Sequence, residues 1–250
     1  MRRFDKVSSI STKMVERLRS KGIDADAVEL FPNWVDTHGV MPLAGVSSYR
    51  AELGIGSDKV VALFSGTWGA KQNLLAIPAA ARKLAHRSDL EFVICGDGVM
   101  RAELEAACAG LPNVRLLPLQ PKERLGDLLG LADIHLLTQS ADAEDLVLPS
   151  KLTGMLSSGR PVVATCRADT EIAAVVSNCG LVVSPTCVDE LAQAIVQLAD
   201  KPALRAELGS HGRNYAEHAL AKDPILARWA MRADQGKVGV AVVTPEHETY

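Results

Sequence analysis

Short runs of β-branched and aliphatic residues alternate along the chain with longer segments of helical periodicity. Eight runs are strand-sized, and they cover residues 6–10, 28–31, 60–65, 91–95, 114–116, 134–138, 161–165 and 181–183. Helical patterns fill the gaps, and such alternation is typical of repeated βα units around a largely parallel sheet. The pattern therefore predicts an α/β fold with a doubly wound, Rossmann-like parallel sheet.

Residues with capping chemistry mark several helix boundaries. Ser11 stands before a helix expected at 14–21, and Gly22 follows the last residue of that helix. Pro121 opens the helix that comes after it, as a first-turn proline can. Beyond Val188 the pattern is wholly helical until a polar tail near the C-terminus.

The first part of the chain breaks the βα rhythm. Residues 38–59 place glycines and a proline around a short helical piece at 49–53, which favours a linker. Residues 1–37 contribute only a strand, a helix and a second strand, too few to bury their own apolar side chains, so we interpret them as a domain remnant or a docking piece. The predicted division is a remnant at 1–37, a linker at 38–59, a Rossmann-like domain at 60–222, a C-terminal helix at 223–236 and a tail at 237–250.

Composition narrows the function classes. A formal net charge of -3 argues against a nucleic-acid partner, because duplex binders concentrate Lys and Arg to neutralise phosphates. The apolar runs are strand-sized, far short of the ~20 residues that cross a bilayer. Five cysteines without a C-x-x-C pair lie in apolar neighbourhoods and fit buried free thiols, and no signal peptide is readable. We expect a cytoplasmic protein.

The polar residues do not suggest a metal or another cofactor. The six histidines show no metal-binding spacing, and His135, inside a predicted strand, is expected to be a packed residue. An acidic cluster of Asp142, Glu144 and Asp145 could hold a divalent ion, but it is better explained as a solvated loop. The chain also has no G-x-S-x-G elbow to supply a hydrolase nucleophile.

Ligands of open α/β sheets bind beyond the carboxyl ends of the strands, and the first such loop has the sequence SGTWGAK at 65–71. Gly66 lets backbone N–H groups approach a phosphate, and Lys71 supplies a full charge before the next helix. The loop is not a P-loop, which requires G-x-x-x-x-G-K-[ST]. A tight turn with a solvated lysine is the other interpretation.

Two further loops carry weaker signals. The sequence GDG at 96–98 has no third glycine at the Rossmann spacing, so a simple turn is favoured over dinucleotide binding. Pro118 and Pro121 lack backbone donors and flank Leu119 and Gln120, whose amides and carbonyls could recognise the edge of a base. A plain loop explains this segment equally well.

A fourth loop combines acidic residues with a helix start. Ser150 can cap a helix that begins near Leu152, and its unpaired N–H groups, with Lys151 nearby, suit a phosphate. The carboxylates at 142–145 could accept sugar hydroxyls. The alternative is a capped helix beside a solvated acidic loop.

Taken together, five segments resemble the retaining GT-B glycosyltransferases in order and spacing, over roughly residues 4–233. They are NWVD at 33–36, SGTWGAKQ at 65–72, GDG at 96–98, AD at 132–133, and PSKL through GRPVVA at 149–164. The first two look closest to the colanic acid biosynthesis subgroup, which builds exopolysaccharide. The resemblance implies the C-terminal half of a GT-B fold, with residues 1–37 matching the end of the N-terminal, acceptor-side domain.

The resemblance also implies a donor site without a metal, filled by a nucleotide sugar. Gly66, Thr67 and Lys71 would meet the donor diphosphate, with Gly96 in the neighbouring loop. Leu119 and Gln120 would lie by the base. The phosphates and sugar would be lined by Glu144, Asp145, Ser150, Lys151 and Leu152.

Two positions depart from the family pattern. Many relatives carry an arginine where Thr67 stands, which leaves this site one fixed positive charge short. They also often carry a glutamate, for the ribose hydroxyls, where Gly154 stands. A glycine inside a helix costs ~1 kcal/mol relative to alanine.

Three functions are compatible with these residues. The leading hypothesis is the donor-binding part of an enzyme that moves a sugar to a lipid-linked or polysaccharide acceptor, in the cytoplasm or at the inner membrane face. No catalytic residue is assignable, and without the first domain, missing or on a separate chain, we expect incomplete catalysis. The alternatives are a nucleotide-sugar epimerase-like enzyme and a truncated, non-catalytic nucleotide-sugar-binding module.

Overall fold

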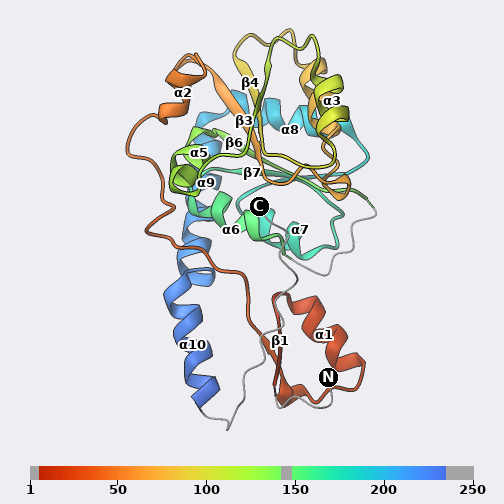
Figure 1. The fold of residues 1–250 in the computed structure, drawn as a ribbon, viewed down its shortest axis with the longest axis vertical. Coiled ribbons are helices and arrows are strands. Elements are labelled where there is room, and N and C mark those ends of the chain that lie inside the picture. The colour runs from red at the N-terminus through yellow and green to blue at the C-terminus, as the bar shows by residue number, and fades with distance from the viewer. Residues whose placement is uncertain (1–5, 142–147, 235–250) are drawn as a thin grey trace.

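The computed structural model describes residues 6–141 and 148–234, and its main feature is a six-stranded parallel sheet (Figure 1). The strand order is β5-β4-β3-β6-β7-β8. The strands are β3 (Val60–Ser65), β4 (Leu90–Cys95), β5 (Val114–Leu117), β6 (Ile134–Thr138), β7 (Val162–Thr165) and β8 (Gly180–Val183). All six strands predicted for this domain are confirmed, as is the Rossmann-like class.

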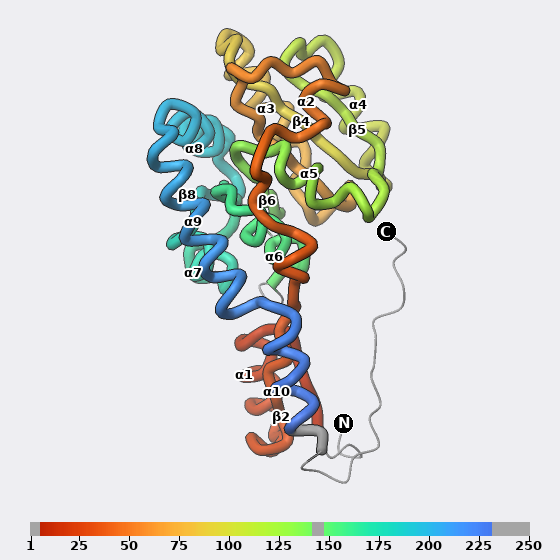
Figure 2. Tube along the Cα trace, turned by 90° about the vertical axis from the view of Figure 1, so that its left-hand side faces the viewer, coloured from red at the N-terminus to blue at the C-terminus, as the bar shows by residue number. Residues whose placement is uncertain are grey.

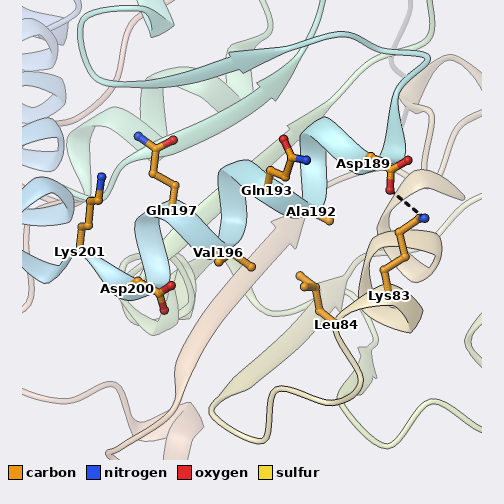
Figure 3. Close-up of a pocket in the computed structure, with 9 residues that line it drawn as sticks. All are labelled: Lys83, Leu84, Asp189, Ala192, Gln193, Val196, Gln197, Asp200 and Lys201. Atoms are coloured by element: carbon orange, nitrogen blue, oxygen red, sulfur yellow. Dashed lines mark ion pairs between the residues drawn. The ribbon is translucent and has the colours of Figure 1, made fainter.

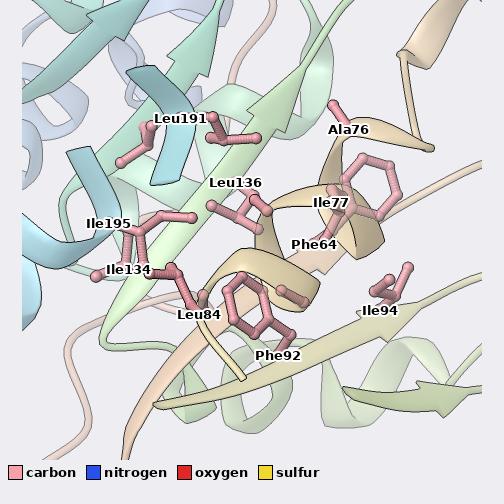
Figure 4. Close-up of a cluster of buried hydrophobic side chains, with 14 of the residues drawn as sticks. Phe64, Ala76, Ile77, Leu84, Phe92, Ile94, Ile134, Leu136, Leu191 and Ile195 are labelled. Atoms are coloured by element: carbon pink, nitrogen blue, oxygen red, sulfur yellow. The ribbon is translucent and has the colours of Figure 1, made fainter. Parts of the chain in front are cut away.

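Helices cover both faces of this sheet, because successive strand residues alternate between two apolar clusters. One face packs against α3 (Ala76–Lys83), α4 (Arg101–Cys108) and α8 (Val188–Asp200), and Figure 4 shows Phe64, Phe92 and Leu136 meeting Ile77 and Ile195 there. The opposite face carries α2 (Ser48–Glu52), α5 (Leu125–Leu131), α6 (Ser150–Ser157), α7 (Glu171–Val176) and α9 (Pro202–Ala219). Single-turn 3₁₀ helices η2 (Ala70–Gln72) and η3 (Lys122–Arg124) precede α3 and α5.

The N-terminal region forms a separate, smaller layer. Strands β1 (Val7–Ser9) and β2 (Val28–Leu30) pair in parallel, linked by α1 (Thr12–Ser20) and the 3₁₀ helix η1 (Ala25–Ala27). The last helix, α10 (Lys222–Asp234), runs beside this layer (Figure 2), and the rings of Phe31 and Trp229 lie 5.7 Å apart between their centroids. The C-terminal helix thus packs on the N-terminal strands.

The segment predicted as a linker, 38–59, packs onto the large sheet domain. Tyr49 is 2% exposed and joins the apolar cluster of β3 and β4. Arg50 forms an ion pair with Asp133 at 2.7 Å, and Asp133 also accepts a hydrogen bond from the backbone amide of Val61. This segment therefore contributes to the core and to the start of the central strands.

The capping predictions had different outcomes. The hydroxyl of Ser11 accepts a hydrogen bond from the amide of Met14, and Gly22 has a left-handed φ of 81° after α1, both as expected. Ser150 does not cap α6: Pro149 holds the N-cap position, Ser150 is the first helical residue, and no side chain caps this end. Proline pre-sets φ but offers no side-chain acceptor. Among the described residues, the amides of Ser150 and Lys151 stay available, whereas that of Leu152 donates to the carbonyl of Pro149 at 3.0 Å.

The cysteines and His135 are buried as predicted, except for Cys187. Four cysteines are buried, whereas Cys187 is only partly buried at the start of α8. His135 is fully buried, and its Nε2 lies 2.9 Å from the hydroxyl of Ser158. Among the described residues, no helix is long and apolar enough to span a membrane.

Candidate donor site

The candidate site residues come from loops at the carboxyl edge of the large sheet. The β3 loop and the β6 loop meet there, because the amide of Ser140 donates to the carbonyl of Lys71 at 2.9 Å. Helix α6 begins beside them, since its Lys151 reaches back to Gln72. Parallel strands bring the β3 loop to the same edge as the β6 loop and α6, although it precedes them by about 70 to 80 residues.

Trp68 anchors the β3 loop. Its side chain is 1% exposed, its amide donates to the carbonyl of Asp97 at 2.7 Å, and the guanidinium of Arg101 lies 5.3 Å from its ring centroid. The tryptophan packs against both glycines of the GDG turn. A methyl group at Gly96 would overlap the carbonyl oxygen of Gly66, and one at Gly98 would lie 2.6 Å from the carbonyl oxygen of Trp68.

The glycines of this turn therefore have a packing role. Gly96 is buried, with φ at 150°, under the β3 loop. Its predicted place in the donor site stays a prediction, and what the geometry supports is the close approach of two backbones. The simple-turn interpretation of GDG agrees with this packing.

Lys151 is the most unusual charged residue at this edge. Its ammonium donates to Oε1 of Gln72 at 2.6 Å and lies 4.3 Å from the ring centroid of Phe64. A methyl group built on Gly66 would be 3.8 Å from the Lys151 nitrogen. Among the described residues no carboxylate pairs with this ammonium, and burial lowers its pKa to about 7. The arrangement provides a poorly solvated cation that an anion could stabilise.

The other predicted phosphate contacts lie on the same loops. Gly66 is partly buried with φ at 139°, and Thr67 and Lys71 are exposed. Ser150 is exposed at the first turn of α6, whereas Leu152 is fully buried and serves the core. The structure thus brings the Gly66 loop and Lys151 together and leaves Leu152 to hold the helix in place. Glu144 and Asp145 lie outside the described residues.

Gly154 faces helix α5. A methyl group at this position would lie 3.1 Å from a terminal methyl of Leu129. That contact is tight but involves the end of a flexible side chain, so a larger residue here must displace Leu129.

Leu119 and Gln120 follow β5, at the edge of the sheet and two strands from β3. Within the described residues, the backbone amide and carbonyl of Leu119 make no hydrogen bond, and the side chain is 52% exposed. The Gln120 carboxamide donates from Nε2 to the carbonyl of Pro118 at 2.7 Å. Beneath it, burial raises the pKa of the Cys95 thiol to about 11, so this thiol is not a nucleophile.

Sequence reasoning missed three residues at this edge. Gln72 and Phe64 contact the Lys151 ammonium, and Tyr49 donates its hydroxyl to Oε1 of Gln120 at 2.9 Å. For Tyr49 the sequence did offer a signal, because a large aromatic residue within a predicted linker suggests a buried contact. The contacts of Gln72 and Phe64 had no local signal, because they depend on the order of the strands.

A hollow of about 600 Å³ lies elsewhere, between α3 and α8 (Figure 3). It is formed by helix residues, and Lys83 and Asp189 pair at 2.8 Å across it. Because no strand-end loop contributes to it, it is separate from the candidate donor site. Among residues 6–141 and 148–234, no cluster of three or more acidic, histidine or cysteine side chains could hold a metal ion.

The six-stranded parallel sheet and the C-terminal helices match the C-terminal half of GT-B structures. The chain belongs to the group 1 glycosyl transferases: the family model "Glycosyl transferases group 1" matches residues 59–201. It is 36% identical over 231 residues to the putative colanic acid biosynthesis glycosyl transferase WcaI of Escherichia coli (strain K12), which covers 90% of this chain. The chain spans about half of that relative, 56% of its length.

Solved structures support the same fold. HepE of Anabaena in complex with UDP-glucose matches with a TM-score of 0.77 and 18% identity, over 92% of this chain and 64% of that one. Sucrose-phosphate synthase of Thermosynechococcus elongatus matches with a TM-score of 0.74 and 19% identity, over 92% and 58% of the two chains. The resemblance to the C-terminal part of GT-B enzymes and to the colanic acid subgroup is therefore confirmed.

Proposed function

We propose that the carboxyl edge of the large sheet binds the diphosphate of a nucleotide sugar. The observation that carries the proposal is Lys151, an ammonium held against Gly66 and Phe64 with Gln72 as its neutral partner. A diphosphate at this edge would supply the missing countercharge. The uncapped amides of Ser150 and Lys151 at the start of α6 would add N–H donors to it.

The spacing of the strands supports a nucleotide lying along this edge. Leu119 and Gln120 follow β5, which is two strands from β3. Neighbouring strands are about 4.8 Å apart, so the two loops are separated by roughly 10 Å. A nucleoside diphosphate can span such a distance, with its base at the amide and carbonyl of Leu119, which have no partner in the described part of the chain.

The names of the relatives support the reaction. WcaI is a putative colanic acid biosynthesis glycosyl transferase, and HepE was solved with UDP-glucose. We infer that this chain is the donor half of an enzyme that transfers a sugar to a lipid-linked or polysaccharide acceptor in exopolysaccharide synthesis. Its partner would be an N-terminal domain, in the same or a separate chain, that extends the two-stranded sheet of β1 and β2.

Calorimetric titration of the full chain with UDP-, GDP- and ADP-glucose tests the proposal. Replacing Lys151→Met keeps the volume and removes the charge, so we expect at least about tenfold weaker binding, as for loss of a charge-assisted hydrogen bond. Lys83→Met, in the hollow between α3 and α8, is the matched control and should bind like the wild type. Absence of binding by a folded wild-type sample at millimolar ligand would refute the donor site.

The pH dependence gives a second readout. The Lys151 pKa of about 7 in the free protein means that the charged form is lost as pH rises above that value. A nucleotide-sugar diphosphate keeps its charge over this range, so affinity should fall as pH rises from about 6 to about 9, by at most tenfold per unit. The Lys151→Met variant should show no such slope.

The same variant should be more stable than the wild type. Burial lowers the Lys151 pKa from 10.5 to about 7, so the charge costs folding free energy fully below about pH 7, and the cost fades as pH rises toward 10.5. At about pH 6, Lys151→Met should raise the free energy of unfolding by on the order of 1 to 3 kcal/mol. An unchanged or lower value in urea unfolding would show that Lys151 carries no such cost.

A further inference from the structure

Tyr49 joins helix α2 to the loop after β5. Its ring is 2% exposed, and its hydroxyl donates to Oε1 of Gln120 at 2.9 Å. The other end of the same carboxamide donates from Nε2 to the carbonyl of Pro118 at 2.7 Å. The Gln120 side chain is therefore held at both its oxygen and its nitrogen.

The Pro118 contact determines which way the carboxamide faces, because a carbonyl only accepts, whereas the Tyr49 hydroxyl can donate or accept. If the amide were turned by 180°, its oxygen would lie 2.7 Å from the carbonyl oxygen of Pro118, and two acceptors repel at that distance. The observed orientation uses the Gln120 oxygen for the Tyr49 hydroxyl. One N–H of Nε2 stays without a partner among the described residues.

Helix α2, which carries Tyr49, is held against η3 and α5 by further contacts. The guanidinium of Arg124 lies 3.9 Å from the Tyr49 ring centroid and pairs with Glu52 at 2.5 Å. The hydroxyl of Ser48 donates to the Asp127 carboxylate at 2.5 Å. Contacts from α2, η3 and α5 thus hold the Tyr49 phenol in place. Its hydroxyl therefore stays beside the oxygen of the Gln120 side chain.

We propose that Tyr49 is a positioning residue that, together with the Pro118 carbonyl, holds Gln120 as a hydrogen-bond donor toward the nucleobase, so that the site selects bases with a carbonyl group at the recognised edge. Uracil and hypoxanthine present such an acceptor, whereas cytosine and adenine present an amino group at the same ring position. This inference rests on the proposed donor site and adds to it the class of base.

The test compares the affinities of the full chain for two matched pairs, UDP against CDP and IDP against ADP. In whichever pair binds, pyrimidine or purine, the keto nucleotide should bind about five- to tenfold more tightly than the amino nucleotide. The keto group accepts one hydrogen bond from Gln120, whereas the amino group is a donor that would face another donor. Tyr49→Phe keeps the ring and removes the hydroxyl. It should reduce this ratio to about one to two while pyrophosphate binds as before.

Two further variants separate positioning from folding. Tyr215→Phe, the same change in α9 away from the site, should keep the wild-type ratio. Gln120→Leu keeps the volume and removes the carboxamide, so it should lose discrimination even if Tyr49→Phe fails to fold. A purely structural role for Tyr49 would weaken all four nucleotides equally and leave their ratio unchanged.

The outcomes distinguish this inference from the proposed function. Equal wild-type affinity for keto and amino nucleotides, or an unchanged ratio in Gln120→Leu, would overturn the assignment of Tyr49 and Gln120 while the donor site stands. Absence of binding by every nucleotide and by pyrophosphate would overturn both.

Discussion

The two parallel sheets of this chain differ in how well they are covered. Helices cover both faces of the six-stranded sheet, and Phe64, Phe92 and Ile134 are fully buried on the face that packs against α3 and α8. In the two-stranded sheet, Val28 is 3% exposed but Leu30, two residues later, is 45% exposed. Similar β-branched patterns thus produce strands in both places and a closed core in only one.

The difference shows what a hydrophobic pattern provides and what it leaves open. A pattern of period two favours an extended backbone, but a pair of strands gains little stability until helices or further strands cover it. Helix α10 supplies part of that cover, since Ile225 is 3% exposed beside the Phe31 and Trp229 rings. We expect the large sheet to set global stability and the small layer to open independently.

The largest expected effect comes from the crowded turn under the β3 loop. Gly96→Ala forces a methyl group into the carbonyl of Gly66, and we expect a loss of about 3 to 5 kcal/mol in the free energy of unfolding. Gly110→Ala is the matched control, because Gly110 also has a left-handed φ, 75°, but nothing within 4 Å of the added atom. It should cost only about 1 to 2 kcal/mol in urea unfolding. Equal losses would show that backbone conformation, not the close approach, determines the cost.

A matched pair of isoleucines tests the comparison itself. Ile195→Ala, in the core between α8 and the large sheet, should lower the global free energy of unfolding by about 2 to 4 kcal/mol. Ile225→Ala should leave the main urea transition in place and speed amide hydrogen exchange in α10, β1 and β2. A main transition shifted equally by both variants would mean that the two layers unfold as one cooperative unit.

The smallest expected effect is a pH dependence of the unfolding free energy, caused by the buried His135 of the large sheet. The Ser158 hydroxyl donates to the carbonyl of Met155 at 2.6 Å, so Nε2 of His135 must donate to Ser158. Burial lowers the His135 pKa from 6.5 to about 3. The unfolded chain therefore takes up a proton first as pH falls, and stability declines from about pH 6.5 toward pH 3.

His135→Gln keeps a donor at the same end and cannot titrate. Between about pH 7 and pH 5, the wild type should lose on the order of 1 to 2 kcal/mol more unfolding free energy than this variant. His86→Gln, at an exposed histidine, should behave like the wild type. Identical urea-unfolding profiles for the wild type and His135→Gln would remove His135 as the cause.

Much of the fold was predictable because its signals are local. All eight strands and the Ser11 cap follow from periodicity and from neighbours within a few residues. Ser150 was assigned as a cap because its residue type is common there, whereas the proline before it already holds the position. The division of 38–59 as a linker relied on glycine and proline content and did not anticipate that Tyr49 enters the core.

The sequence by itself determined the class of sheet and the positions of its strands, and it predicted the loops proposed to bind a diphosphate. Tertiary structure alone decided that Lys151 lies against Phe64 and Gly66, that Trp68 requires Gly96 and Gly98, and that Tyr49 orients Gln120. The physical reason is that these contacts join residues about 30 to 90 positions apart. Strand order and helix packing set such contacts, and no local pattern of residues encodes them.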